Sequence, residues 1–235
     1  MTTTLFKALG AATTLAGIIA SAGSANAASL TKTASTSFAL TDIINQSIGV
    51  EQFNSSFGTL QSVTIDFTAD IKGDAGFENR SPNPAQITVT LGSNINLSLN
   101  NQSLFTLNPQ NVSSYQTAAY DGINNFGGTS GQIVPGLMAS QSGTFASTDS
   151  QFLQSFVGSG NMNFMFSALA NSAVTGSGNI SSFVDTLAKA NIQVTYEYDP
   201  AQSVPEASAV LGLGLIAGIG LLSQHKKGWL KTANS

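Results

Sequence analysis

The chain has 235 residues, of which 42% are hydrophobic and 9% are charged. The absence of cysteine excludes disulfides, thiolate metal sites and a cysteine nucleophile, so the fold depends on packing. Between Ala28 and Pro205, four basic and eleven acidic residues give a net charge of −7, which disfavours nucleic-acid binding because phosphates require a basic face.

The N-terminus has the pattern of a secretory signal peptide. Lys7 supplies the positive start, and residues 8–22 form a weakly apolar centre. Ala25 and Ala27 then match the small-residue motif of a cleavage site. We therefore expect a signal helix that is removed during export, with Ala28 as the mature N-terminus.

The middle of the chain, residues 28–198, has the composition of an exported β-rich domain, because its many uncharged polar residues suit strand faces and turns. Apolar and polar residues alternate over three stretches, 62–79, 86–99 and 192–198. This period of two places the apolar side chains on one face of each strand. Gly73 and Gly76 allow a bend or bulge in the first stretch, and Gly92-Ser93-Asn94 is expected to break the second.

Shorter strands and one long loop complete this region. The expected short strands are 31–41, 104–107, 142–147, 152–157, 162–168, 173–178 and 183–187. Glycine and asparagine make residues 120–131 a loop. Many short strands separated by turn residues predict an all-β fold, an antiparallel β-sandwich of Greek-key or jelly-roll type.

Several of these segments also resemble a known family. They are Gly58-Thr59-Leu60-Gln61-Ser62-Val63, Glu78-Asn79-Arg80-Ser81, Ile87-Thr88-Val89, Tyr120-Asp121-Gly122, Gly127-Gly128-Thr129-Ser130-Gly131, Gly176-Ser177-Gly178-Asn179 and Val194-Thr195-Tyr196-Glu197-Tyr198. Over most of residues 38–198 the chain is similar to the choice-of-anchor E domain. The resemblance implies an exported β-rich domain carried on a surface anchor. It implies no catalytic residue, because the family has no established activity.

The C-terminus has the pattern of a membrane segment. Residues 207–223 carry no charge, and as a helix they would span about 25 Å. Lys226, Lys227 and Lys231 follow as a basic stop that resists translocation. Pro205 has no backbone N–H and marks the boundary between an extended linker and this helix.

Val204, Pro205 and Glu206, followed by the apolar run and the basic cluster, resemble the PEP-CTERM sorting signal. The resemblance implies processing by an exosortase, a membrane-embedded transpeptidase-like protease of Gram-negative bacteria that export polysaccharide. Ala207 stands where the family commonly has proline, and the basic end is rich in lysine rather than arginine. The alternative is an ordinary C-terminal membrane anchor.

Two further constellations concern metals and histidine. His225 is the single histidine and lies in the sorting tail, so the exported domain has neither a Ser-His-Asp triad nor a histidine zinc site. Asp121, Asn124 and Asn125 offer oxygen ligands for calcium in a tight loop. Gly122 is misplaced for the EF-hand pattern, however, and the same residues are typical of a turn.

Carboxylates are the remaining candidates for chemistry. Asp66, Asp70 and Asp74 share one strand face, but residues four apart on a strand lie about 13 Å from each other, which favours a solvated face over an ion site. Glu51, Glu78 and Glu197 are candidates for glycoside hydrolysis by residue type alone. The sequence therefore predicts no catalytic residue, no metal beyond the calcium alternative, and no cofactor.

These patterns together predict an organisation and a role. The expected parts are a signal peptide (1–27), an exported β-sandwich domain (28–198), a linker with the Val-Pro-Glu motif (199–206), a transmembrane sorting helix (207–223) and a basic cytoplasmic tail (224–235). The expected function is non-enzymatic, namely a structural or interaction role in the cell envelope or an extracellular polysaccharide matrix. The expected partners are the secretion machinery, an exosortase, the membrane and a polysaccharide. A carbohydrate-binding or calcium-stiffened adhesion module is the alternative, and a glycoside-active enzyme is the third hypothesis.

Overall fold

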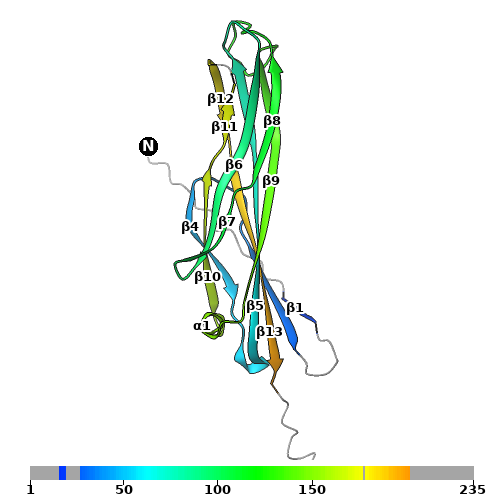
Figure 1. Ribbon diagram of the computed structural model, residues 1–235, viewed down its shortest axis with the longest axis vertical. Coiled ribbons are helices and arrows are strands. Elements are labelled where there is room, and N and C mark those ends of the chain that lie inside the picture. The colour runs from blue at the N-terminus through cyan, green and yellow to red at the C-terminus, as the bar shows by residue number, and fades with distance from the viewer. Residues whose placement is uncertain (1–15, 20–26, 177, 202–235) are drawn as a thin grey trace, which may run out of the picture. The chain divides into compact units, whose positions relative to one another are not determined.

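A computed structural model describes residues 16–19, 27–176 and 178–201 of the chain. Contacts divide the chain into two units, Met1–Pro200 and Ala201–Ser235, and the description below concerns the first. Its long strands run side by side in two antiparallel sheets (Figure 1). Within the described ranges, no helix is long and apolar enough to cross a membrane.

The larger sheet is built around one very long strand, β5. Its described members are β1 (Ala16–Ile19), β2 (Ala28–Ser35), β3 (Ala39–Leu40), β5 (Gly58–Asn79), β9 (Gly131–Ser147), β12 (Ile180–Val184) and β13 (Leu187–Pro200). One edge of β5 pairs with β13 and then with β12, and the other edge pairs with β9. Beyond β13 lie β2 and β3, and β1 pairs with β2.

The second sheet is arranged in the same way around β6. Its described members are β4 (Ile43–Glu51), β6 (Ala85–Leu99), β7 (Gln102–Leu107), β8 (Gln110–Thr117), β10 (Asn161–Ala170) and β11 (Ala173–Thr175). β6 pairs with β10, β11, β7 and β8, and β4 pairs with β10. A short 3-10 helix, η1 (Ser55–Phe57), precedes β5, and α1 (Ser150–Gln154) follows β9.

The core lies between the facing sides of the two sheets. Alternate residues of β5, from Val63 to Phe67 and onward, are completely buried, as the period-two pattern predicted. Phe67 packs against Phe105 and Phe166 of the second sheet, with ring centroids 5.5 and 6.5 Å apart. Full burial of such a side chain contributes about 1.5–3 kcal/mol. The predicted all-β sandwich is thereby confirmed.

Several sequence predictions agree with the strands. The predicted bend in β5 is a register shift between Gly73 and Ala75. The predicted closing strand is β13, and the predicted strand at 162–168 is β10. In β6, by contrast, the expected break is absent: Ser93 continues the strand, and its buried hydroxyl donates to the carbonyl of Leu169 at 2.9 Å. The interruption occurs in the neighbouring strands instead, because β8 pairs with residues 85–92 of β6 and β7 pairs with residues 95–99.

Two further predictions about local structure are wrong. Residues 152–157 do not form a strand, because Asp149 caps the helix α1 by accepting a hydrogen bond from the Phe152 backbone at 2.8 Å. In the expected signal helix, the described residues Ala16–Ile19 form strand β1 instead, since the edge of β2 offers unpaired backbone groups. The rest of that segment, and the predicted transmembrane helix 207–223, lie outside the described residues.

Candidate functional site

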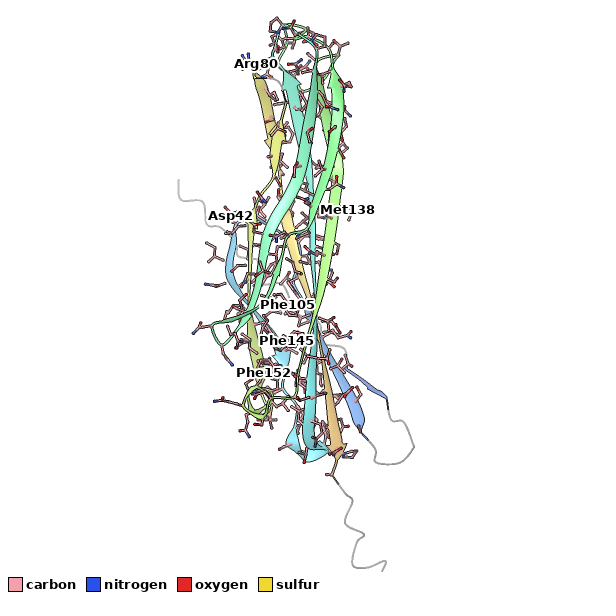
Figure 2. The ribbon with its side chains drawn as sticks, viewed as in Figure 1. Asp42, Arg80, Phe105, Met138, Phe145 and Phe152 are labelled. Atoms are coloured by element: carbon pink, nitrogen blue, oxygen red, sulfur yellow. The ribbon has the colours of Figure 1, made fainter. Side chains whose placement is uncertain are left out.

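The two ends of β5 define the two ends of the sandwich. Gly58 begins the strand and pairs with Pro200, the last residue of β13, whereas Asn79 ends it beside Ile180. A strand of 22 residues, rising about 3.3 Å per residue, spans about 70 Å. We call the end at Gly58 and Pro200 the base, and the end at Asn79 the tip (Figure 1). Arg80 lies at the tip and Phe152 toward the base (Figure 2).

At the tip, segments that are far apart in the sequence converge on Asn79. Its buried side-chain amide donates to the carbonyls of Asn83 and Ala118, at 2.9 and 2.8 Å. Its backbone N–H donates to the carbonyl of Ser130 at 2.8 Å. The next residue, Arg80, donates its backbone N–H to Asn179 at 2.9 Å. Tyr120 joins this group, since its backbone N–H donates to the carbonyl of Ser81 at 2.9 Å. Four of the segments that carry the choice-of-anchor resemblance therefore meet at one place.

Glu78 is a completely buried carboxylate beneath the loop of residues 118–131. The Ser130 hydroxyl donates to its Oε1 at 2.5 Å, and the Asn125 backbone N–H donates to Oε2 at 3.3 Å. Gly131 packs so closely against Oε2 that a side chain has no room there. A buried carboxylate is costly unless it is hydrogen-bonded, so Glu78 ties the loop to β5.

The three calcium candidates lie in this loop and bond to its neighbourhood. Asp121 accepts from the backbone N–H of Ile123 at 3.0 Å, and Asn125 accepts from that of Gly127 at 2.9 Å. Asn124 donates to the hydroxyl of Ser181 at 3.4 Å. Among the described residues, no three His, Cys, Asp or Glu side chains group as metal ligands. The candidates thus act as turn residues here, and calcium binding stays a prediction.

The structure separates Glu78 from Glu197, two of the three carboxylates considered for glycoside hydrolysis. Glu51 forms an ion pair of 2.7 Å with Lys32. Glu197 accepts from the hydroxyl of Ser62 at 3.2 Å. Glu78 is 16 residues beyond Ser62 on β5, about 50 Å away, whereas paired catalytic carboxylates lie within about 10 Å. Glu78 and Glu197 cannot act on one bond.

The aspartates of β5 each bond to β9. Asp66 accepts from the hydroxyl of Thr144 at 2.5 Å, and Asp70 accepts from that of Ser140 at 2.7 Å. Asp74 accepts from the backbone N–H of Gly136 at 2.7 Å. These three hydrogen bonds connect β5 to β9 on the outer face of the sheet, so the carboxylates stabilise the sheet rather than bind a common ion.

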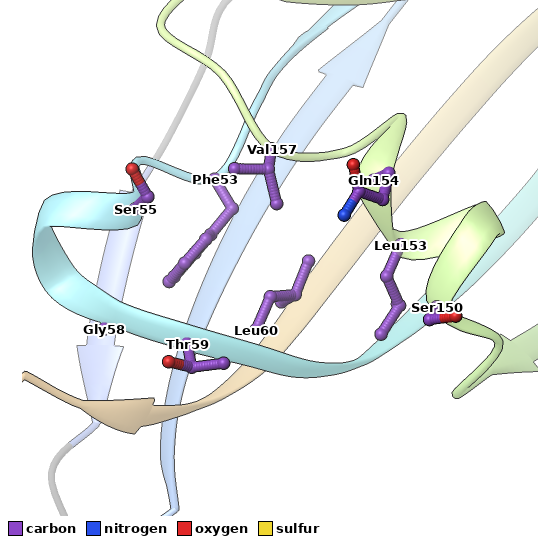
Figure 3. Close-up of a pocket in the computed structure, with 9 residues that line it drawn as sticks. All are labelled: Phe53, Ser55, Gly58, Thr59, Leu60, Ser150, Leu153, Gln154 and Val157. Carbon is purple, nitrogen blue, oxygen red and sulfur yellow. The ribbon is translucent and has the colours of Figure 1, made fainter.

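An apolar pocket of about 300 Å³ lies near the base. Its walls come from η1, the start of β5, and α1 with the residues that follow it (Figure 3). Phe53, Leu60, Leu153 and Val157 supply most of its apolar surface. It holds no titratable side chain, so it could accept a small apolar group without chemistry. Sequence reasoning missed this pocket because its residues come from three separate elements.

Tyr196 is a buried ionisable group close to this end of the core. Its hydroxyl donates to the backbone carbonyl of Glu51 at 2.9 Å, and its ring packs near Phe53 and Phe156. Burial, with a smaller contribution from the Glu51 carboxylate, raises the pKa of Tyr196 well above its ordinary value. Tyr196 therefore stays neutral and structural at physiological pH.

Most residues predicted to direct sorting lie outside the described part of the chain. They are Ala25, Val204, Pro205, Glu206, Lys226, Lys227 and Lys231. Ala27 is described and exposed, and Ala28 is the first residue of β2. The predicted cleavage position thus lies between β1 and β2, at the first residue of β2.

Comparisons with known proteins give little further information. No family model and no curated protein matches the chain. Among solved structures, it is similar to particles derived from infectious bursal virus, with 13% identity, 79% of this chain and 46% of that chain covered, and a TM-score of 0.14. The structure of infectious bursal disease virus strain Gx is 13% identical, with 86% of this chain and 50% of the viral chain covered and a TM-score of 0.13. The chain spans about half the length of these viral chains, and such low TM-scores support no argument about fold or function.

Proposed function

We propose that this chain is an exported, non-enzymatic surface protein with a structural or interaction role in the cell envelope or an extracellular polysaccharide matrix. A signal peptide directs it across the inner membrane of a Gram-negative cell. The C-terminal segment then holds it at the surface until an exosortase processes the Val-Pro-Glu motif. The role of the sandwich is to present surfaces rather than to catalyse a reaction.

The observation that carries this proposal is the separation of base and tip. The chain leaves the sandwich at Pro200, whereas four of the segments with the choice-of-anchor resemblance (78–81, 120–122, 127–131 and 176–179) gather near Asn79 at the opposite end. A module tethered through its C-terminus would keep these segments about 70 Å from the point of exit. Loops placed on a rigid scaffold commonly carry interactions.

The Greek-key or jelly-roll pattern is part of the same proposal. Support comes from the crossings between sheets: the chain passes from β5 to β6, returns to the first sheet at β9, and crosses again to β10. Such crossings are typical of antiparallel sandwiches of exported proteins.

A carbohydrate-binding or calcium-stiffened adhesion module is the second candidate. The exposed carboxylate of Asp121 and the amides of Asn124 and Asn125 favour it, because they lie together in the loop at the tip. The two proposals differ in whether the tip requires a bound ion. They share the export route and the sandwich.

The test is localisation in two otherwise identical Gram-negative hosts, one with an exosortase and one without. We expect the tagged chain at the surface or in the medium of the first host, and in the membrane of the second. Replacing the motif residue by Glu206→Ala should give the membrane-bound result in both hosts. The linker variant Gln202→Ala is the matched control and should behave like the parent chain. Identical fractionation in the two hosts would refute exosortase processing.

A further inference from the structure

An apolar and cationic patch lies on the outer face of the larger sheet. Leu40, Leu187, Lys72 and Met138 lie directly opposite one another across β3, β13, β5 and β9. Lys189 lies two residues beyond Leu187 and therefore points to the same face. The ring of Phe38 lies beside both lysines, with centroid distances of 4.5 Å to Lys72 Nζ and 5.9 Å to Lys189 Nζ.

We call this group the two-lysine patch. Its members are Phe38, Leu40, Lys72, Met138, Leu187 and Lys189. Leu40 is 65% exposed and Met138 is 61% exposed, and Met138 lies midway along the sandwich (Figure 2). The next row of the same face pairs Asp70 with Ser140, which are hydrogen-bonded at 2.7 Å, and the row after it pairs the hydroxyls of Thr68 and Ser142 at 2.8 Å. Large exposed apolar side chains on a polar sheet face suggest a contact surface.

The two lysines have no carboxylate partner within the described part of the chain, where the ion pair found is Lys32–Glu51. The nearest acidic residue in the register, Asp70, directs both oxygens elsewhere: it accepts from Ser140 and from Asn191, each at 2.7 Å. Asp74 accepts from the backbone of Gly136. Both ammonium groups therefore stay available to an anion, although the domain as a whole is acidic.

We propose that the two-lysine patch binds an acidic polysaccharide, a chain of sugars that carry carboxylates. The carboxylates pair with Lys72 and Lys189, and the C–H faces of the sugar rings pack on Phe38, Leu40 and Met138. The two lysines stand on adjacent strands as diagonal neighbours, about 7–8 Å apart at their backbones. The hydroxyls and amides of the surrounding face add hydrogen bonds to sugar hydroxyls.

The chemistry of the patch favours this ligand over a lipid surface. Anionic bilayers attract clusters of many basic residues. Here only two lysines gather, fewer than the cluster that an anionic bilayer requires. A flexible polysaccharide can place single carboxylates at the two ammonium groups and direct its hydroxyls toward Asp66, Asp70 and Asp74, the carboxylates of the same face. The inference deepens the proposed role in the matrix by naming the ligand class and the site.

Isothermal titration calorimetry of the full chain in neutral detergent micelles tests the patch. The probes are polygalacturonate, neutral dextran and glycerophosphoglycerol, the soluble headgroup of phosphatidylglycerol. EDTA in the buffer removes calcium bridges between carboxylates. We expect binding to polygalacturonate, none to dextran, and weaker or no binding to the headgroup.

Matched variants locate the site. Lys72→Gln and Lys189→Gln should each weaken binding about tenfold, because each removes one charge-assisted contact. Arg80→Gln removes the same charge at the tip, where the residue is also exposed, and should leave the affinity unchanged. Thermal melting of each variant confirms the fold.

Three results would overturn the proposal: no heat with polygalacturonate, equal losses in Lys72→Gln and Arg80→Gln, or tighter binding of the lipid headgroup. Because the titration uses purified protein, none of them bears on export or anchoring, which the localisation experiment tests separately.

Discussion

Gly131 begins β9 directly beside the buried carboxylate of Glu78, and a methyl group there has nowhere to go. The Cβ of alanine would lie 2.8 Å from Cδ of Glu78 and 2.7 Å from the backbone nitrogen of Gly127. Glu78 could move aside only by giving up its bonds from Ser130 and Asn125. Overpacking costs about 1–3 kcal/mol, and a lost bond to a charged group about 1.5–3 kcal/mol. We expect Gly131→Ala to lower the free energy of unfolding by about 3–5 kcal/mol.

Thermal unfolding followed by circular dichroism measures this loss. For a domain of this size it corresponds to a decrease in Tm of roughly 6–20 °C. Gly178→Ala is the matched control, since its Cβ would meet no atom within 4 Å. The control should change stability by less than about 0.5 kcal/mol. A Gly131→Ala variant as stable as Gly178→Ala would refute the role given to Glu78.

Three further outcomes follow from the core, from Tyr196 and from the tip loop. Phe67→Ala should cost about 3–5 kcal/mol in urea unfolding, because the ring is completely buried between the sheets; a loss below about 1 kcal/mol would contradict the packing. Tyr196→Phe should cost about 1–2 kcal/mol at neutral pH through its lost bond to Glu51. Burial raises the folded-state pKa of Tyr196, so with rising pH this tyrosine ionises in the unfolded chain before it ionises in the folded one. Its contribution to the free energy of unfolding is therefore complete below about pH 10 and is lost as the pH rises further. Tyr196→Phe should therefore reduce the loss of stability at alkaline pH, whereas Tyr120→Phe should leave that loss unchanged. An equal loss of stability in both variants would be inconsistent with this cause. Calcium should leave the Tm unchanged, because Asp121 and Asn125 already bond within their loop; an increase that Asp121→Asn abolishes would favour the adhesion module instead.

The period-two pattern predicted the inner face of β5 correctly because one side of that strand meets the core and the other meets solvent. The same rule fails at the end of the strand. Beyond the bulge at Gly73, residues 75–79 are all buried, since the loop of residues 118–131 covers the outer face. The alternation consequently places Glu78 on the solvent-exposed face of the predicted strand, whereas the structure buries it completely.

Local competition explains one of the other errors, and contacts between distant segments explain the rest. Residues 152–157 have the apolar content of a strand, but the side chain of Asp149 satisfies a free N–H and starts a helical turn. Strand β8 was not predicted, because Gln110–Thr117 is mostly polar and its pairing with β6 is a long-range choice. The two-lysine patch joins residues from four segments, which single-sequence periodicity cannot bring together.

The central claim is that the chain is exported and processed at both ends, and the intact mass of the protein recovered from the surface of an exosortase-containing host tests it most directly. The account predicts a mass that begins at Ala28 and lacks the residues beyond the Val204-Pro205-Glu206 motif. Recovery of the complete chain from Met1 to Ser235, dissolved in the cytosol, would contradict it.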